Sequence, residues 1–145
     1  MSETIVVGTD GSETAKRAVQ EAVRLAKALK AEVHIVAGFT PAHRTISGAP
    51  TGAAKVWQPL PDSHVEALSQ EAEAAVRLAG AQAKTHIVRG DPADALLKVA
   101  KEVGASTIVV GNRGMHGGRR VLGSVPNTVS HKANCNVLIV QTDHA

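Results

Sequence analysis

Aromatic residues are almost missing from this chain, which has one phenylalanine, one tryptophan and no tyrosine among 145 residues. Proteins that bind single-stranded nucleic acid usually stack the bases on aromatic rings, so this scarcity argues against a specific nucleic-acid partner. The hydrophobic core must instead be built from Val, Ile, Leu and Ala. That composition suits helices packed closely on a parallel sheet.

Cysteine and long apolar runs are scarce as well. The single cysteine, Cys135, excludes an internal disulfide and fits a reducing compartment, so we expect a cytoplasmic protein. No apolar run approaches the length that spans a membrane, and the first residues do not resemble a signal peptide. We therefore expect no membrane partner.

The length and charge set further bounds. A chain of 145 residues suits one domain, which we expect to cover residues 1–145. The formal net charge of +3 is mild, and a small phosphate ligand accounts for it without a polyanionic partner.

Strand-like and helix-like patterns alternate along the whole chain. Apolar, β-branched runs predict strands over 4–7, 32–37, 84–88, 106–110 and 136–141. Helical spacing of apolar residues, or a capped turn, predicts helices over 12–30, 62–79, from 92 onward, and over 125–133. This alternation predicts an α/β fold: a doubly wound, Rossmann-like parallel sheet of five strands with helices on both faces.

The segment 39–61 interrupts this alternation. It is rich in proline and glycine and shows no clear periodicity. So long a connection in a compact domain is typical of either a functional lid or disorder, and both interpretations stay open. Trp57, inside it, is a candidate either to cover a bound base or to anchor the segment.

The sequence Gly111-Asn112-Arg113-Gly114 directly follows an apolar run, 107–110, that is typical of a fully buried strand. Gly123-Ser124, further on, leads into a helix. Glycines let the backbone approach an anion, and the N–H groups at the start of a helix point toward it. This pattern predicts a phosphate-binding loop.

A second loop at the same edge of the sheet follows the first strand. Asp10 is a candidate to accept hydrogen bonds from a ribose hydroxyl or an adenine amino group. It also stands three residues before Glu13, the spacing of a helix capping box, so capping is the commoner alternative. Thr9 and Ser12 have the same two interpretations.

Other functional motifs are weaker. Gly118 and Gly123-Ser124 imitate part of a P-loop, but the required lysine is missing. The seven histidines are scattered without metal-ligand spacing, so we predict no metal site. No arrangement of nucleophile and base is evident, and we predict no catalytic residues.

The motifs together resemble those of the universal stress protein family over nearly the whole chain. The similarity is carried by Ile5-Val6-Val7-Gly8-Thr9-Asp10-Gly11-Ser12, by Val88-Arg89-Gly90-Asp91-Pro92, by the glycine-rich stretch, and by Val137-Leu138-Ile139-Val140. The resemblance implies strand order 3-2-1-4-5, a homodimer, and, in the branch marked by Gly-x2-Gly-x9-Gly-Ser/Thr, binding of adenine nucleotides.

The resemblance also implies roles for individual residues. Asp10 and Thr9 would contact the adenosine, the backbone near Gly38 the adenine edge, and Val110 the base. The residues expected around the phosphates are Gly111, Arg113, Gly114, Gly123, Ser124 and Val125.

The chain departs from the family pattern in its loop, because eight residues rather than nine separate Gly114 from Gly123. The preferred ligand therefore stays open among ATP, with or without Mg²⁺, ADP, AMP and cyclic AMP. Beyond Asp10, no acidic residue of the predicted site would hold magnesium, so we expect slow or no hydrolysis. The alternatives are a dimeric interaction protein that binds no nucleotide and a weak ATPase.

The last predicted strand is continuously apolar but would lie at the edge of the sheet in the implied order. Exposed apolar edges favour pairing with a second copy. We therefore expect a two-fold homodimer through Asn136 to Gln141.

Overall fold

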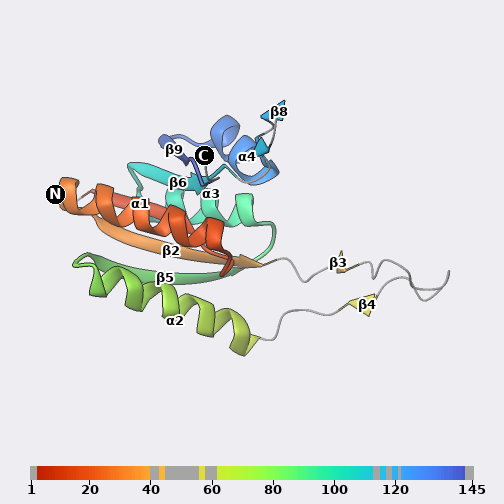
Figure 1. Ribbon diagram of the computed structural model, residues 1–145, viewed down its shortest axis with the longest axis horizontal. Coiled ribbons are helices and arrows are strands. Elements are labelled where there is room, and N and C mark those ends of the chain that lie inside the picture. The colour runs from red at the N-terminus through yellow and green to blue at the C-terminus, as the bar shows by residue number, and fades with distance from the viewer. Residues whose placement is uncertain are drawn as a thin grey trace.

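The computed structural model describes residues 3–39, 43–44, 56–57, 62–112, 115–116, 119–120 and 122–142. Its centre is a parallel sheet in the spatial order β5-β2-β1-β6-β9 (Figure 1). These strands are Thr4–Gly8 (β1), Glu32–Phe39 (β2), Gln82–Arg89 (β5), Thr107–Gly111 (β6) and Asn136–Val140 (β9). Counted along the chain, the five strands have the order 3-2-1-4-5, so the predicted topology is confirmed.

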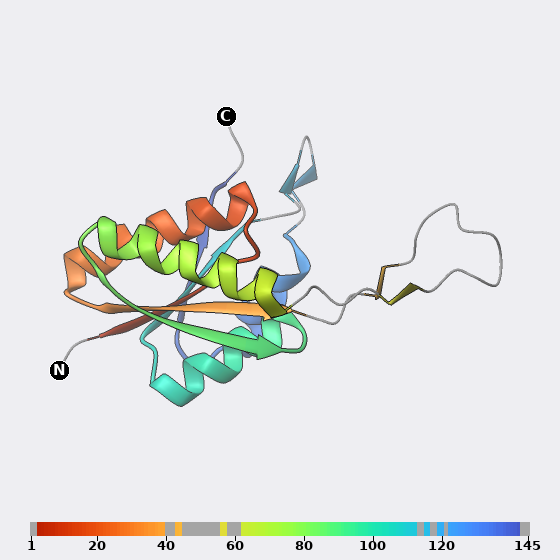
Figure 2. The same cartoon turned by 90° about the horizontal axis from the view of Figure 1, so that it is seen from below.

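Helices cover both faces of this sheet (Figure 2). The helices α1 (Glu13–Leu29) and α2 (Asp62–Leu78) lie on one face, and α3 (Pro92–Val103) and α4 (Ser124–Lys132) lie on the other. Because side chains alternate along a strand, Val6 packs with α3 whereas Ile5 and Val7 pack with α1. The two helix layers therefore enclose two separate apolar cores.

The central strands β1 and β6 are the most deeply buried part of the sheet. Ile5, Val6, Val7, Ile108 and Val109 are all fully buried. Burial on both faces explains why these strands read as continuous apolar runs rather than as alternating ones. No helix within the described ranges is long and apolar enough to cross a membrane.

The start of α1 corrects one prediction. Ser12, not Asp10, is the N-cap: its hydroxyl oxygen accepts a hydrogen bond from the Ala15 N–H at 3.1 Å. The Asp10 carboxylate accepts instead from the Ser12 N–H at 2.9 Å, which tightens the turn before the helix. The capping interpretation of Asp10 is therefore wrong, because a second capping residue lies closer to the first helical turn.

The start of α3 agrees with its prediction. Asp91 is the N-cap, and its Oδ2 accepts hydrogen bonds from the N–H groups of Ala93 (3.0 Å) and Asp94 (3.2 Å). Pro92 occupies the first turn, where its missing N–H costs nothing.

Two short antiparallel pairs were not predicted. β3 (His43–Arg44) pairs with β4 (Val56–Trp57), and β7 (Met115–His116) pairs with β8 (Arg119–Arg120). Two residues are too few to show an alternating pattern in the sequence. Whether 39–61 is a lid or is disordered, and what the Trp57 side chain contacts, lie outside the described residues.

Candidate functional site

A cleft of about 660 Å³ opens at the carboxyl ends of β1 and β6. Its walls come from these strand ends, the first turns of α1 and α3, and the start of α4. In doubly wound sheets this edge, where the chain order of the strands reverses, is the usual ligand position. The predicted site residues that line the cleft are Thr9, Asp10, Val110, Gly111, Gly123, Ser124 and Val125.

The other predicted site residues are placed differently. Gly38 lies in β2, in register with Val88 of β5. Arg113 and Gly114 lie outside the described residues. Sequence reasoning missed the apolar contribution of α3, since Pro92 and Leu96 also line the cleft.

The turn after β1 forms one wall and is held by its own hydrogen bonds. The Thr9 N–H donates to the Val36 carbonyl at 2.9 Å, which extends the pairing of β1 with β2 by one residue. Gly11 has a φ of +81°, a conformation that glycine adopts without strain. A Cβ atom at Gly11 would lie 2.5 Å from Leu68 Cδ2, so the turn also packs closely on α2.

The base of the cleft is apolar and well buried. Val36 is 1% exposed, Leu96 3% and Val110 4%. Among the described residues that line the cleft, Asp10 is the only ionisable one. A flat apolar ring fits against such a wall, with Asp10 at the rim to accept hydrogen bonds.

The amino end of α4 forms a polar wall of the cleft, made of backbone N–H groups. Gly123 is its N-cap and makes no side-chain capping bond. The first hydrogen bond of the helix is donated by the Asn127 N–H to the Gly123 carbonyl at 3.0 Å, so the N–H groups of Ser124 and Val125 precede it. Backbone N–H groups at a helix start, together with the positive end of the helix dipole, favour an anion there.

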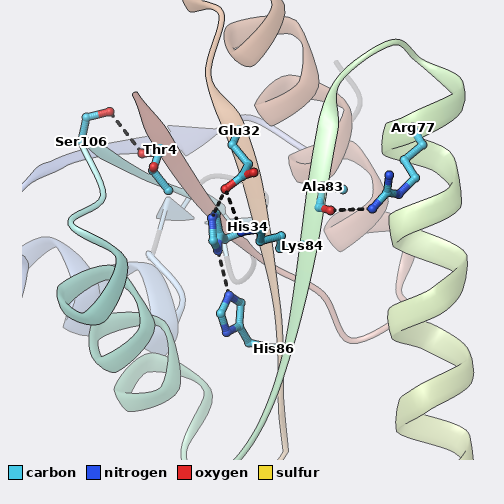
Figure 3. A network of polar contacts seen from close by, with 8 residues as sticks. All are labelled: Thr4, Glu32, His34, Arg77, Ala83, Lys84, His86 and Ser106. Atoms are coloured by element: carbon cyan, nitrogen blue, oxygen red, sulfur yellow. Dashed lines mark hydrogen bonds and ion pairs between the residues drawn. The ribbon is translucent and has the colours of Figure 1, made fainter. Parts of the chain in front are cut away.

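A second polar cluster, formed by Glu32, His34 and His86, lies between β2 and β5 (Figure 3). His34 Nε2 lies 2.7 Å from Glu32 Oε1, and His34 Nδ1 lies 2.8 Å from His86 Nε2. His34 is 5% exposed. The spacing of the histidines in the sequence does not reveal this pair, because the register of β2 with β5 brings together residues 52 positions apart.

The Glu32 carboxylate sets the direction of the hydrogen bonds in this cluster. It accepts from Nε2–H of His34, so Nδ1 of a neutral His34 accepts from Nε2–H of His86. The two rings are stacked with centroids 5.0 Å apart, so a positive charge on His86 would lie close to the His34 ring.

The surroundings of His86 disfavour its protonated form. Burial lowers the pKa of His86 below its usual value, and His34 lowers it further. Glu102 of α3 raises this pKa in opposition, while Lys84 on the same strand lowers it. Within the described ranges no group of three or more His, Cys, Asp or Glu side chains could hold a metal ion.

Comparison with known proteins gives consistent matches over the whole length. Residues 1–141 match the universal stress protein family. Universal stress protein Rv1636 of Mycobacterium tuberculosis is 35% identical over 150 residues, which cover 97% of each chain.

Solved structures share the fold. A universal stress protein in complex with cAMP superposes with a TM-score of 0.77 at 35% identity and covers 98% of both chains. The universal stress protein from Archaeoglobus fulgidus in complex with dAMP gives a TM-score of 0.69 at 26% identity, with 96% of this chain and 98% of that one covered.

Proposed function

Because this chain belongs to the universal stress protein family, we propose that it binds an adenine nucleotide in the cleft and acts as a regulatory protein of the stress response. One observation carries the proposal: an apolar wall and a helix start without a side-chain capping bond, Gly123 to Val125, line the same cleft. The cAMP and dAMP complexes of similar proteins support the choice of ligand.

The walls suggest how each part of a nucleotide binds. Val36, Leu96 and Val110 offer the base an apolar surface, with the backbone near Gly38 at its edge. Asp10, beside Thr9, accepts hydrogen bonds from the ribose or the adenine amino group.

The phosphates belong on the other side of the cleft. Gly111, Gly123, Ser124 and the Val125 N–H surround them in this proposal, and Ser124 also offers a hydroxyl. Arg113 and Gly114 belong to the proposed site by their place in the glycine-rich motif.

We further propose that hydrolysis is slow or does not occur. Efficient phosphoryl transfer needs a positioned metal and a group that orients the attacking water. Asp10 is the single carboxylate among the described lining residues, so a bound Mg²⁺ would depend mainly on the phosphate oxygens of ATP. ATP, ADP, AMP and cyclic AMP all remain candidates, and a cytoplasmic location remains a prediction.

A homodimer through β9 is the last part of the proposal. This strand is at the edge of the sheet, and its side chains Leu138 and Ile139 are each 37% exposed. Large apolar side chains on an unpaired edge favour association with another copy. The same observation supports the alternative function, a dimeric interaction protein without a nucleotide.

The direct test asks whether purified protein carries a nucleotide. Denaturation followed by an ultraviolet spectrum and mass spectrometry detects even partial occupancy, because one tryptophan and no tyrosine contribute little absorbance. Titration of stripped protein with AMP, cAMP and ATP then ranks the ligands.

A pair of serine variants on α4 locates the site. We expect Ser124→Ala to weaken nucleotide binding several-fold, on the order of one lost hydrogen bond. Ser130 is exposed, lines no part of the described cleft, and its hydroxyl donates to the Asn127 carbonyl, so Ser130→Ala should bind as the wild type does. Absence of binding by the wild type would leave the interaction protein as the better hypothesis, and fast hydrolysis abolished by Ser124→Ala would establish the ATPase.

A further inference from the structure

Asn112, directly after β6, has the smallest exposed fraction of the described buried polar residues, 1%. Its Oδ1 accepts two hydrogen bonds from Thr142, one from the N–H at 2.9 Å and one from the hydroxyl at 2.6 Å. Its Nδ2 donates to Gln141 Oε1 at 2.8 Å. The side chain therefore bonds to a single short segment, the two residues that follow Val140.

These bonds continue the pairing of β6 with β9 beyond the end of the sheet. The last register pair is Gly111 with Val140, and the Asn112 N–H donates to the Val140 carbonyl at 3.0 Å. A valine at this position would form the same backbone bond, whereas a buried amide must recover its desolvation cost through hydrogen bonds. The Asn112 side-chain amide adds hydrogen bonds that hold residues 141–142 in one conformation where they leave the sheet.

Gly111 lies between this network and the cleft. A Cβ atom at Gly111 would lie 2.9 Å from Thr14 Cγ2 and 3.3 Å from Thr142 Cγ2, so the glycine fits closely between α1 and the segment after β9. Thr142 thus has two contacts with different atoms. Its hydroxyl bonds to Asn112, and its methyl group lies beside Gly111, in the space that a side chain at Gly111 would occupy.

We propose that Asn112 is a positioning residue for phosphate binding: through Gln141 and Thr142 it fixes Gly111 in the wall of the cleft, so that Gly111 and the start of α4 together hold a nucleotide phosphate. The inference rests on the proposed function and gives a role to the motif residue that had none. Asn112 itself does not line the cleft among the described residues. It acts through Gly111.

This role predicts different effects of Asn112 on the binding of the adenosine part and of the phosphate part of the ligand. Adenosine would contact the turn after β1 and the apolar wall, none of which bonds to Asn112. A nucleotide with a phosphate would also need Gly111 in its place. Loosening Asn112 should therefore weaken AMP binding and leave adenosine binding nearly unchanged.

Three variants dissect the contact. Asn112→Ala removes all its side-chain bonds, Thr142→Val removes the hydroxyl but keeps a branched side chain, and Thr142→Ser keeps the hydroxyl but removes the methyl group. We expect AMP affinity to fall about ten-fold in Asn112→Ala and by less in each of the two Thr142 variants, because each of them removes one of the two contacts that join Asn112 to Gly111. Isothermal titration with AMP and with adenosine, below the melting temperature of every variant, measures both affinities.

Hydrogen exchange gives a second measurement on the wild type. The Thr142 N–H donates to Asn112 Oδ1, and the Asn136 N–H donates to the Ser106 carbonyl at the other end of the same strand pair. We expect AMP to slow exchange at the Thr142 amide more than at the Asn136 amide, since Thr142 lies next to Gly111 in the wall of the cleft and Asn136 lies at the far end of β9. If Asn112 had a purely structural role, AMP would slow exchange at the Thr142 and Asn136 amides equally.

The outcomes separate the two proposals. A wild type that binds neither AMP nor adenosine overturns the proposed function and this inference with it. A wild type that binds AMP, with equal affinity in Thr142→Val and equal slowing at both amides, overturns the positioning role alone. If Asn112→Ala does not fold, Thr142→Val and the exchange rates decide, and a selective loss of AMP binding with protection at Thr142 supports the role.

Discussion

At the scale of single residues, His86 ties the stability of the fold to pH. Its pKa is lowered in the folded protein, chiefly by burial and then by His34, so the unfolded chain binds the proton more tightly. Linkage then requires the free energy of unfolding to fall as the pH drops through about 6.5, the ordinary histidine value, and to level off below the folded-state pKa.

We predict that His86→Gln weakens this pH dependence. Thermal melts between pH 5 and pH 8 should show the wild type losing stability toward acid more steeply than His86→Gln does. His131→Gln is the matched control, because His131 is exposed on α4 and should leave the wild-type profile unchanged. Parallel profiles for the wild type and His86→Gln would show that the pair does not couple folding to this proton.

This pair also marks what the sequence alone could reveal about single residues. Apolar patterns predicted that residues 34 and 86 belong to strands, but the register of β2 with β5 decides that they meet. Register depends on packing of the whole sheet, which no local pattern encodes. The capping alternative for Asp10 was wrong for a different reason, because Ser12 competes with Asp10 for the same helix end.

At the scale of elements, the turn between β1 and α1 combines a positive φ with close packing on α2. Gly11 meets both conditions, whereas Gly104, with a φ of +65°, has no atom within 4 Å of an added Cβ. Comparing alanine substitutions at the two glycines therefore distinguishes the cost of backbone strain from the cost of a steric contact.

We predict that Gly104→Ala lowers the free energy of unfolding by about 1 kcal/mol, the cost of a left-handed alanine. Gly11→Ala should cost about 1 to 3 kcal/mol more, because its methyl group would meet Leu68. Urea unfolding measures both values. Leu68→Ala in the Gly11→Ala background should recover part of the added loss, and failure to do so would mean that the contact is not the cause.

The longer elements were predictable, and the short ones were not. Periodic apolar residues over a dozen positions or more predicted α1 and α2 close to their observed bounds. The pairs β3–β4 and β7–β8 are too short to leave a pattern. The cleft was largely predictable because the carboxyl ends of parallel strands meet at one edge. Leu96 was not, because it enters the cleft from α3, four positions after Pro92, the last residue of the nearest motif.

At the scale of the whole molecule, the proposed dimer requires the exposed side chains of β9 to stay apolar. We predict that Ile139→Lys yields a monomer by light scattering, because a charge would be buried between two copies of the strand. Leu78→Lys is the control, since Leu78 is 90% exposed and belongs to α2, which leads into β5 at the opposite edge of the sheet from β9. Dimeric Ile139→Lys, or monomeric Leu78→Lys, would assign the interface to another surface.

The contact between Asn112 and Thr142 has a practical consequence for handling the protein. Polypeptide appended after Ala145 would join the chain three residues after Thr142, whose side chain lies beside Gly111 of the cleft wall, whereas residue 3 precedes β1 at the amino end of the strands, remote from the cleft. Affinity tags and fluorescent fusions therefore belong at the amino terminus. With a carboxyl-terminal fusion, a change in nucleotide affinity could come from the cleft itself or from the fusion disturbing Thr142, and a binding measurement would not distinguish the two causes.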